Sequence, residues 1–161
     1  YGSRLAEADI LAVQDADDLS LPDRAEKCLP RMKRCDVLYH GAYINMWDKG
    51  VQAITRKYIP APALDRERLL KGQYMAGYPF YRKELWQKKP FRLETQHMYD
   101  WCMYLDWAFS GAKFRNFDCG LYEYVRHENS ASIRFEREGL RQQSAQKIKE
   151  IMLKEHGQTV G

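Results

Sequence analysis

The sequence predicts an α/β protein in which a mixed sheet is flanked by helices. Two observations carry this prediction. Short apolar runs bounded by turn residues are typical of strands, and they alternate with longer segments in which apolar residues recur at helical spacing. The chain has 161 residues, enough for one domain with a core, so we expect a single domain over residues 1–161.

The first elements are predicted from patterns between Arg4 and Lys33. The segment Arg4-Leu5-Ala6-Glu7-Ala8 is expected to end a helix, and the apolar run Ile10–Val13 is expected to form a buried strand. A helix is predicted over Pro22–Lys33 because proline is favoured in a first turn and the apolar residues share one face. These residues are Leu21, Ala25, Cys28, Leu29 and Met32.

The next segments predict a pair of strands. Residues 36–47 form a strand-like run with Gly41 as a possible bulge, and Val51–Tyr58 is expected to return beside an earlier strand. Asp48-Lys49-Gly50 is the predicted turn between them.

The rest of the chain is predicted to be mainly helical. Glu94–Gly111 is the strongest helical pattern, with Met98, Trp101, Cys102, Leu105 and Ala108 at helical spacing and a glycine at its end. The other predicted elements are helices over Leu64–Lys71 and Arg82–Trp86, a strand over Phe114–Val125, and a carboxyl-terminal amphipathic helix over residues 134–156.

Composition limits the classes of function. The net charge is +4, and the basic residues are dispersed apart from Arg31-Met32-Lys33-Arg34 and Lys88-Lys89, which argues against nucleic-acid binding. Anionic substrates or an anionic membrane surface would not be repelled, so peripheral membrane association is compatible with the sequence. The four cysteines show no metal-binding spacing, and no apolar run is long enough to span a membrane, so we expect a cytoplasmic protein.

The candidate site is Asp15-Ala16-Asp17-Asp18, directly after the first predicted strand. Carboxylates this close repel one another unless a cation lies between them, and Mg²⁺ or Mn²⁺ is the simplest such cation. Acidic residues in this position also often just open a turn and cap a helix, here at Leu21-Pro22-Asp23-Arg24, and that alternative stays open. An EF-hand loop is excluded because Ser20 stands where glycine is needed and Leu19 where a ligand is needed.

Several segments together resemble a family-2 glycosyltransferase with the A-type nucleotide-sugar fold, over nearly all of the chain up to about Ile133. The segments are Arg4-Leu5-Ala6-Glu7-Ala8, Asp15-Ala16-Asp17-Asp18 followed by Leu21-Pro22-Asp23-Arg24, Asp36-Val37-Leu38-Tyr39, Asp48-Lys49-Gly50, the late helix around Asp100, and Tyr124-Val125-Arg126-His127 followed by Ser130 and Ser132. The resemblance implies metal-dependent transfer of a sugar from a nucleotide-diphosphate donor to a hydroxyl acceptor, with inversion by direct displacement.

The resemblance also implies roles for individual residues. Asp15 and Asp17 would hold Mn²⁺ or Mg²⁺ on the donor diphosphate, with His127 as a further ligand. Arg126 would pair with phosphate oxygens, and Asp100 would be the base that activates the acceptor. The sequence departs from the family pattern at Tyr99, where a glutamate is usual, and in the order Tyr-Val-Arg-His, which shifts the arginine by one position.

Two further features of the family bear on this chain. Gly77 and Tyr78, with Trp86, stand where the acceptor loop would be. The family begins with a strand and a nucleotide-binding segment that this sequence does not contain before Tyr1, so we expect the carboxyl-terminal two-thirds of such a domain.

Two other functions remain open from the sequence. A phosphatase of the haloacid dehalogenase type also uses a strand-end Asp-x-Asp, which Asp15 and Asp17 fit, although no adjacent acidic pair follows Asp18. The third alternative is a non-catalytic fragment that folds or associates with a missing partner segment.

Overall fold

The computed structural model describes residues 2–48, 53–75, 79–95, 97–127 and 130–158. The chain falls into two compact units. Unit 1 comprises Tyr1–Leu64, Met75–Trp86 and Lys113–His127, and unit 2 comprises Asp65–Tyr74, Gln87–Ala112 and Glu128–Gly161. Unit 1 contains the sheet and unit 2 is helical, so the fold class is α/β, as the alternating patterns predict.

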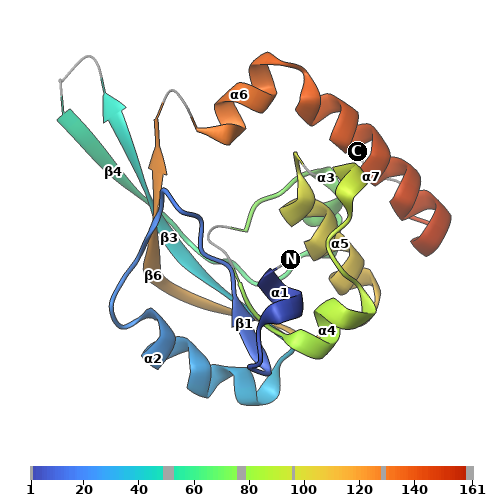
Figure 1. Ribbon diagram of the computed structural model, residues 1–161, viewed down its shortest axis with the longest axis horizontal. Helices are drawn as coiled ribbons and strands as arrows, with labels where there is room; N and C mark the ends of the chain where they lie inside the picture. Colours follow the sequence, from blue (N-terminus) through green and yellow to red (C-terminus); the bar gives the residue numbers. More distant parts are fainter. Residues whose placement is uncertain (1, 49–52, 76–78, 96, 128–129, 159–161) are drawn as a thin grey trace. The chain divides into compact units, whose positions relative to one another are not determined.

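The strands of unit 1 form one mixed sheet in the order β1-β5-β3-β6-β2, with β4 also paired to β3 (Figure 1). Their bounds are β1 Ile10–Ala12, β2 Leu19–Ser20, β3 Val37–Asp48, β4 Ala53–Ile59, β5 Phe80–Arg82 and β6 Phe114–Arg126. The β3 and β6 pair is parallel, whereas β1 with β5, β2 with β6, β3 with β4 and β3 with β5 are antiparallel. By this pairing β1, β3 and β6 all run in the same direction. The short β1 ends at Ala12, level with Leu38 near the start of β3, whereas β3 and β6 continue for about ten residues further.

The first strand differs from its prediction as a buried strand. Leu11 is buried, but Ile10 is only partly buried and Ala12 is exposed. The reason is its place at one end of the strand order, where fewer neighbours cover it than cover β3.

The predicted bulge at Gly41 is present. The register between β3 and β6 shifts on both sides of Gly41, between His40 and Gly41 and again between Gly41 and Tyr43. A Cβ atom at Gly41 would collide with the ring of Tyr58, and one at Gly120 on β6 would collide with the ring of Tyr43. The bulge therefore needs glycine because tyrosine rings lie directly against the backbone.

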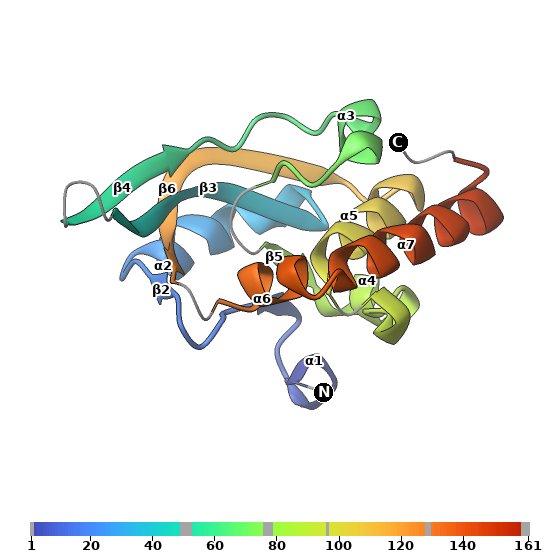
Figure 2. The same ribbon diagram turned by 90° about the horizontal axis from the view of Figure 1, so that it is seen from above.

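The predicted helix over Pro22–Lys33 is two shorter elements, α2 (Arg24–Cys28) and the 3₁₀ helix η1 (Leu29–Arg34). Pro30 lacks the N–H that an α-helix needs at this position, so the chain tightens into the 3₁₀ form. The two elements lie along one face of the sheet, as Figure 2 shows. Their buried side chains pack with those of the sheet in one cluster: Cys28, Met32, Cys35, Leu38, Phe80 and Leu121.

Two further short helices, α1 and α4, begin in unit 1. The short helix α1 (Gly2–Leu5) precedes β1 and ends before Ala6, earlier than predicted. The helix α4 (Lys83–Lys88) follows β5 and carries the chain from unit 1 into unit 2, close to the predicted Arg82–Trp86.

Unit 2 is built around the helix α5 (Tyr99–Phe109), whose residues from Trp101 to Ala108 are all buried. Its indole groups hold neighbouring segments: Trp101 Nε1 donates to the carbonyl of Leu69 at 2.7 Å, and Trp107 Nε1 donates to that of Lys89 at 3.0 Å. The other elements of unit 2 are α3 (Arg66–Lys71), η2 (Leu93–Thr95), α6 (Ala131–Arg137) and α7 (Leu140–His156). The predicted helix over Glu94–Gly111 is therefore shorter, with a 3₁₀ turn before it.

The predicted helix over residues 134–156 is interrupted. It divides into α6 and α7 at Gly139, whose φ of 68° lies in the left-handed region that glycine adopts without strain. Within α7 the buried residues Ser144, Ile148, Ile151 and Met152 follow helical spacing, so the amphipathic pattern holds from Leu140 onward.

Some predictions lie partly outside the described residues. The turn at Asp48-Lys49-Gly50 includes residues 49 and 50, and the expected acceptor loop includes Gly77 and Tyr78, none of which the structure describes. In the described ranges, no helix combines the length and the apolar character needed to cross a membrane.

A buried histidine gives unit 1 a pH dependence. Arg24 Nε donates to His40 Nε2 at 3.0 Å, so the proton of the neutral ring lies on Nδ1, which faces the carbonyl of Gly41 at 2.8 Å. Burial, together with the nearby Arg24 charge, lowers the pKa of His40 to about 4, although the Gly41 carbonyl acts in the opposite direction.

Since His40 takes up a proton more readily when unfolded, stability is full above pH 6.5 and falls as the pH drops toward 4. The free energy of unfolding should decrease by roughly 3 kcal/mol over this interval. Urea unfolding at several pH values would measure this, and His40→Gln should flatten the dependence while the exposed His127→Gln should not. Equal slopes in the wild type and His40→Gln would contradict the prediction.

Candidate metal-binding site

The acidic segment follows β1 and lies at the edge of the sheet where β6 ends, because its contacts are with Tyr122, Val125 and His127. After β1 the chain turns, with the N–H of Asp18 donating to the carbonyl of Asp15 at 3.3 Å, and β2 then pairs with β6. Asp15, Asp17 and Asp18 each offer a carboxylate oxygen within 4.8 Å of the others. In α/β sheets this edge is where ligands commonly bind.

The three carboxylates differ in exposure. Asp17 is exposed and Asp15 is partly buried, whereas Asp18 is only 6% exposed. Both oxygens of Asp18 accept hydrogen bonds, Oδ2 from the hydroxyl of Tyr122 at 2.7 Å and Oδ1 from the N–H of Val125 at 2.8 Å. Burial raises the pKa of Asp18, and the charges of its acidic neighbours add to the rise. Asp18 therefore anchors the segment to β6 and adds negative charge to it.

Gln14 and Arg24 make further hydrogen bonds that hold the acidic segment. The side-chain amide of Gln14 donates to the carbonyls of Asp15 at 3.0 Å and Asp18 at 2.9 Å. Arg24, which is buried, donates to the hydroxyl of Ser20 at 2.8 Å and to Gln14 Oε1 at 3.2 Å. The backbone of the turn is thus held by side chains that contribute no negative charge.

His127 reaches the acidic segment from a distant part of the sequence. Its Nε2 lies 3.2 Å from Asp17 Oδ2, although the two residues are separated by 110 positions. Both side chains are exposed, 43% for His127 and 52% for Asp17. An exposed ion pair contributes little to stability, so a bound cation would displace it at small cost.

Arg126 is the last residue of β6 and its side chain is exposed. Alternation along the strand gives Arg126, Tyr124 and Tyr122 the same face of the sheet. Tyr122 contacts Asp18 on that face. Arg126 is thus next in sequence to His127 and on the strand face that contacts the acidic segment.

Asp100 belongs to the helix α5 of unit 2, and its described contacts are with residues of that unit. It is the second residue of that helix, and its carboxylate accepts hydrogen bonds from the Gln73 side chain and from the N–H of Trp101. Burial raises the pKa of Asp100, while these hydrogen bonds and the charge of Arg141 lower it by less.

The donor set of the acidic segment fits a hard divalent cation. Asp15 and Asp17 offer carboxylate oxygens, which Mg²⁺ and Mn²⁺ prefer, and His127 offers an imidazole nitrogen of the kind that Mn²⁺ accepts. Because both Asp18 oxygens already accept hydrogen bonds, the ligands expected from this segment are the other two aspartates.

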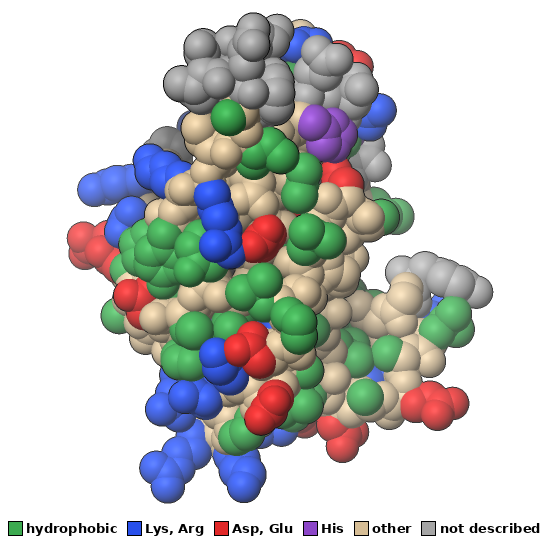
Figure 3. All heavy atoms as spheres, turned by 90° about the vertical axis from the view of Figure 1, so that its left-hand side faces the viewer, with side chains coloured by type: hydrophobic (Ala, Val, Ile, Leu, Met, Phe, Trp, Pro, Cys, Tyr) green, Lys and Arg blue, Asp and Glu red, His purple; other side chains and the backbone are tan. Residues whose placement is uncertain are grey.

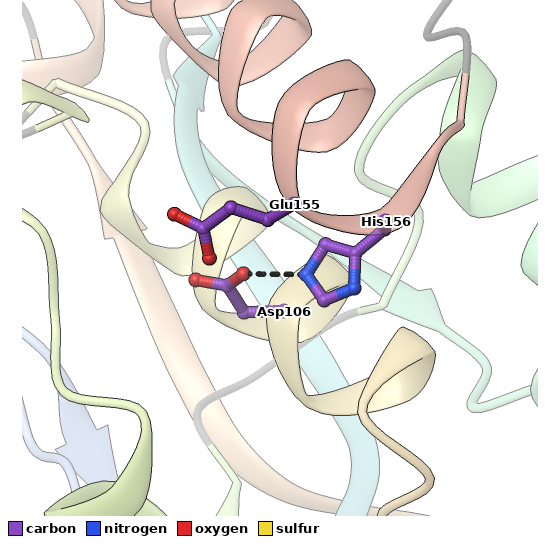
Figure 4. Close-up of side chains that lie close together, drawn as sticks. All are labelled: Asp106, Glu155 and His156. Carbon is purple, nitrogen blue, oxygen red and sulfur yellow. Dashed lines mark hydrogen bonds and ion pairs between the residues drawn. The ribbon is translucent and has the colours of Figure 1, made fainter.

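A second cluster, which the sequence did not predict, combines Asp106 of α5 with Glu155 and His156 of α7 (Figure 4). Here the protein itself supplies the cation. Arg92 donates to both oxygens of Asp106, at 2.7 and 3.2 Å, and to both oxygens of Glu155, at 2.8 and 2.6 Å. The Arg92 guanidinium lowers the pKa of Glu155 to about 2. These interactions indicate an ion-pair network that holds α7 to α5.

No local motif marks this network, since its members come from three separate segments of the sequence. The available signal was Asp106 among the apolar and aromatic residues from Trp101 to Ala108, because a carboxylate that becomes buried requires a partner.

A group of exposed basic side chains of unit 1 lies near the start of β6, at the opposite end of this strand from the acidic segment. Lys33 and Arg34 on η1 and Arg115 near the start of β6 are exposed. Figure 3 shows Lys and Arg side chains gathered at the lower edge of the drawn face, at the height of α2 in Figure 1. The acidic segment and this basic surface therefore lie at opposite ends of β6.

Neither a scan against protein-family models nor a search of curated proteins finds a match to this chain. The resemblance to family-2 glycosyltransferases therefore rests on the residues quoted above and stays a prediction.

Proposed function

We propose that this chain belongs to a metal-dependent glycosyltransferase that moves a sugar from a nucleotide-diphosphate donor to a hydroxyl acceptor, with inversion. The observation that carries the proposal is the convergence of Asp15, Asp17 and His127 at the carboxyl end of β6, a strand of the parallel β3 and β6 pair. A diphosphate leaving group needs a cation to neutralise its charge, and these side chains are suited to hold one.

In this proposal each candidate site residue of unit 1 has a stated role. Asp15 and Asp17 hold Mn²⁺ or Mg²⁺ with His127, and the exposed Arg126 pairs with phosphate oxygens. The cation supplies Lewis-acid stabilisation of the charge that develops on the departing diphosphate. Together these side chains would orient the diphosphate of the donor at this edge of the sheet.

Asp100 is the proposed base that accepts the proton of the acceptor hydroxyl. Its raised pKa supports this role, since a carboxylate with a raised pKa is a stronger proton acceptor than an exposed one. The helix α5, buried along most of its length, would hold this carboxylate in a fixed orientation.

Replacement of Asp17 tests the cation site. Asp17→Asn should weaken Mn²⁺ binding by about tenfold or more, because it removes one of the few anionic ligands, while the fold is retained because Asp17 is exposed. Calorimetric titration with Mn²⁺, alone and then with a panel of nucleotide-diphosphate sugars, measures both affinities.

Glu155→Gln is the matched control, since Glu155 belongs to the network that Arg92 already neutralises. It should leave Mn²⁺ affinity unchanged. Equal Mn²⁺ affinity in the wild type and Asp17→Asn would remove the proposed site. Release of phosphate from a simple phosphomonoester by the wild type would favour the phosphatase alternative.

Replacement of Asp100 tests the base. Asp100→Asn should lower the rate of sugar transfer by about 10²–10⁴-fold without changing Mn²⁺ or donor affinity, because a general base acts only in the chemical step. A steady-state transfer assay with the Mn²⁺-loaded protein measures this, and Glu94→Gln, an exposed acid of η2, is the control. A fully active Asp100→Asn variant would exclude Asp100 as the base.

We also propose a cytoplasmic location at the inner face of a membrane. The contact with the membrane would be made by Lys33 and Arg34 of η1 and by Leu29 at the start of η1, which is 44% exposed. Co-sedimentation with phosphatidylcholine vesicles containing phosphatidylserine should show binding that falls about fivefold in Lys33→Glu. Lys154→Glu, on the exposed part of α7, should bind as the wild type does. Equal binding of vesicles with and without phosphatidylserine would contradict the proposal.

A further inference from the structure

We propose that Tyr122 is a positioning residue that sets the geometry of the cation site without contacting the cation, an inference that rests on the proposed function. Its hydroxyl contacts both ends of the acidic segment, since it accepts the N–H of Asp15 at 3.3 Å and donates to Asp18 Oδ2 at 2.7 Å. One oxygen atom therefore closes the turn that carries Asp15 and Asp17.

The same strand carries the other proposed ligand. Tyr122 lies on β6, and the N–H of Val125 on that strand donates to Asp18 Oδ1 at 2.8 Å, two residues before His127. Asp18 is thus bonded to β6 at two points, one of them the Tyr122 hydroxyl. This double attachment holds Asp18, the neighbour of Asp17 in sequence, near the end of β6, where His127 Nε2 lies 3.2 Å from Asp17 Oδ2.

The Tyr122 ring is itself held rigidly. Its exposed fraction is 1%, and the guanidinium of Arg24 lies 4.8 Å from the ring centroid. The same guanidinium lies 5.2 Å from the ring centroid of Phe80. Because Arg24 also bonds Ser20 and Gln14, the hydroxyl of Tyr122 and the backbone of the turn share one buried support.

A purely structural tyrosine would affect stability but not cation affinity. The chain offers a matched comparison in Tyr39 on β3, which is 0% exposed and whose hydroxyl donates to the carbonyl of Pro62 at 2.5 Å. Both tyrosines are buried in unit 1, and both hydroxyls make long-range hydrogen bonds. Only the hydroxyl of Tyr122 contacts the acidic segment among the contacts described for the two rings.

The test is Mn²⁺ titration of the wild type, Tyr122→Phe and Tyr39→Phe, at a temperature where circular dichroism shows each variant folded. Tyr122→Phe should raise the dissociation constant for Mn²⁺ by about fivefold to tenfold, the effect of one lost hydrogen bond. Tyr39→Phe should leave the dissociation constant for Mn²⁺ unchanged within about twofold. Each variant loses the hydrogen bond that its hydroxyl donates, so the unfolding temperatures of Tyr39→Phe and Tyr122→Phe should fall by similar amounts.

The shift of the unfolding temperature on addition of Mn²⁺ gives a second measurement, which stays valid for a variant that is only partly folded. Mn²⁺ should raise the unfolding temperature of the wild type and Tyr39→Phe by similar amounts, and that of Tyr122→Phe by less. Wild-type affinity in Tyr122→Phe, or equal losses in both variants, would overturn the positioning role. Absence of Mn²⁺ binding by the wild type would instead overturn the proposed function, and the positioning role with it.

Discussion

The attachment of Asp18 to β6 is the interaction on which the candidate site depends. A buried carboxylate is stable only when donors satisfy it, and here a hydroxyl and a backbone N–H do so. These bonds, together with the pairing of β2 with β6, tie the turn after β1 to a strand more than 100 residues later. The burial of Asp18 thus leaves Asp15 partly exposed and Asp17 exposed beside His127.

The two acidic clusters show opposite solutions to the same electrostatic problem. In unit 2 the Arg92 guanidinium lies between Asp106 and Glu155, and their negative charges are balanced within the protein. In unit 1 the buried Arg24 donates hydrogen bonds to His40, Ser20 and Gln14. Asp17 instead pairs with His127 at the surface, where a ligand can reach both side chains, which is the physical distinction between a structural network and a candidate binding site.

Local sequence patterns predicted most elements because helix and strand periodicity depend on neighbouring residues. The long strand from Val37, the bulge at Gly41 and the helix α3 all follow from such patterns. The predictions that differed did so for reasons of context. Pro30 tightened α2 into η1, Gly139 divided the last helix, and the edge position of β1 left it less buried than its apolar residues suggested.

By itself the sequence determined the α/β class, the mixed character of the sheet and the acidic segment after the first strand. Only the tertiary structure decided which acid is buried, that Tyr122 closes the turn, and that His127 lies beside Asp17. It also decided that Asp106 belongs to an ion-pair network with Arg92. The reason is that burial and long-range hydrogen bonds depend on strand register and helix packing, which no local pattern of residues specifies.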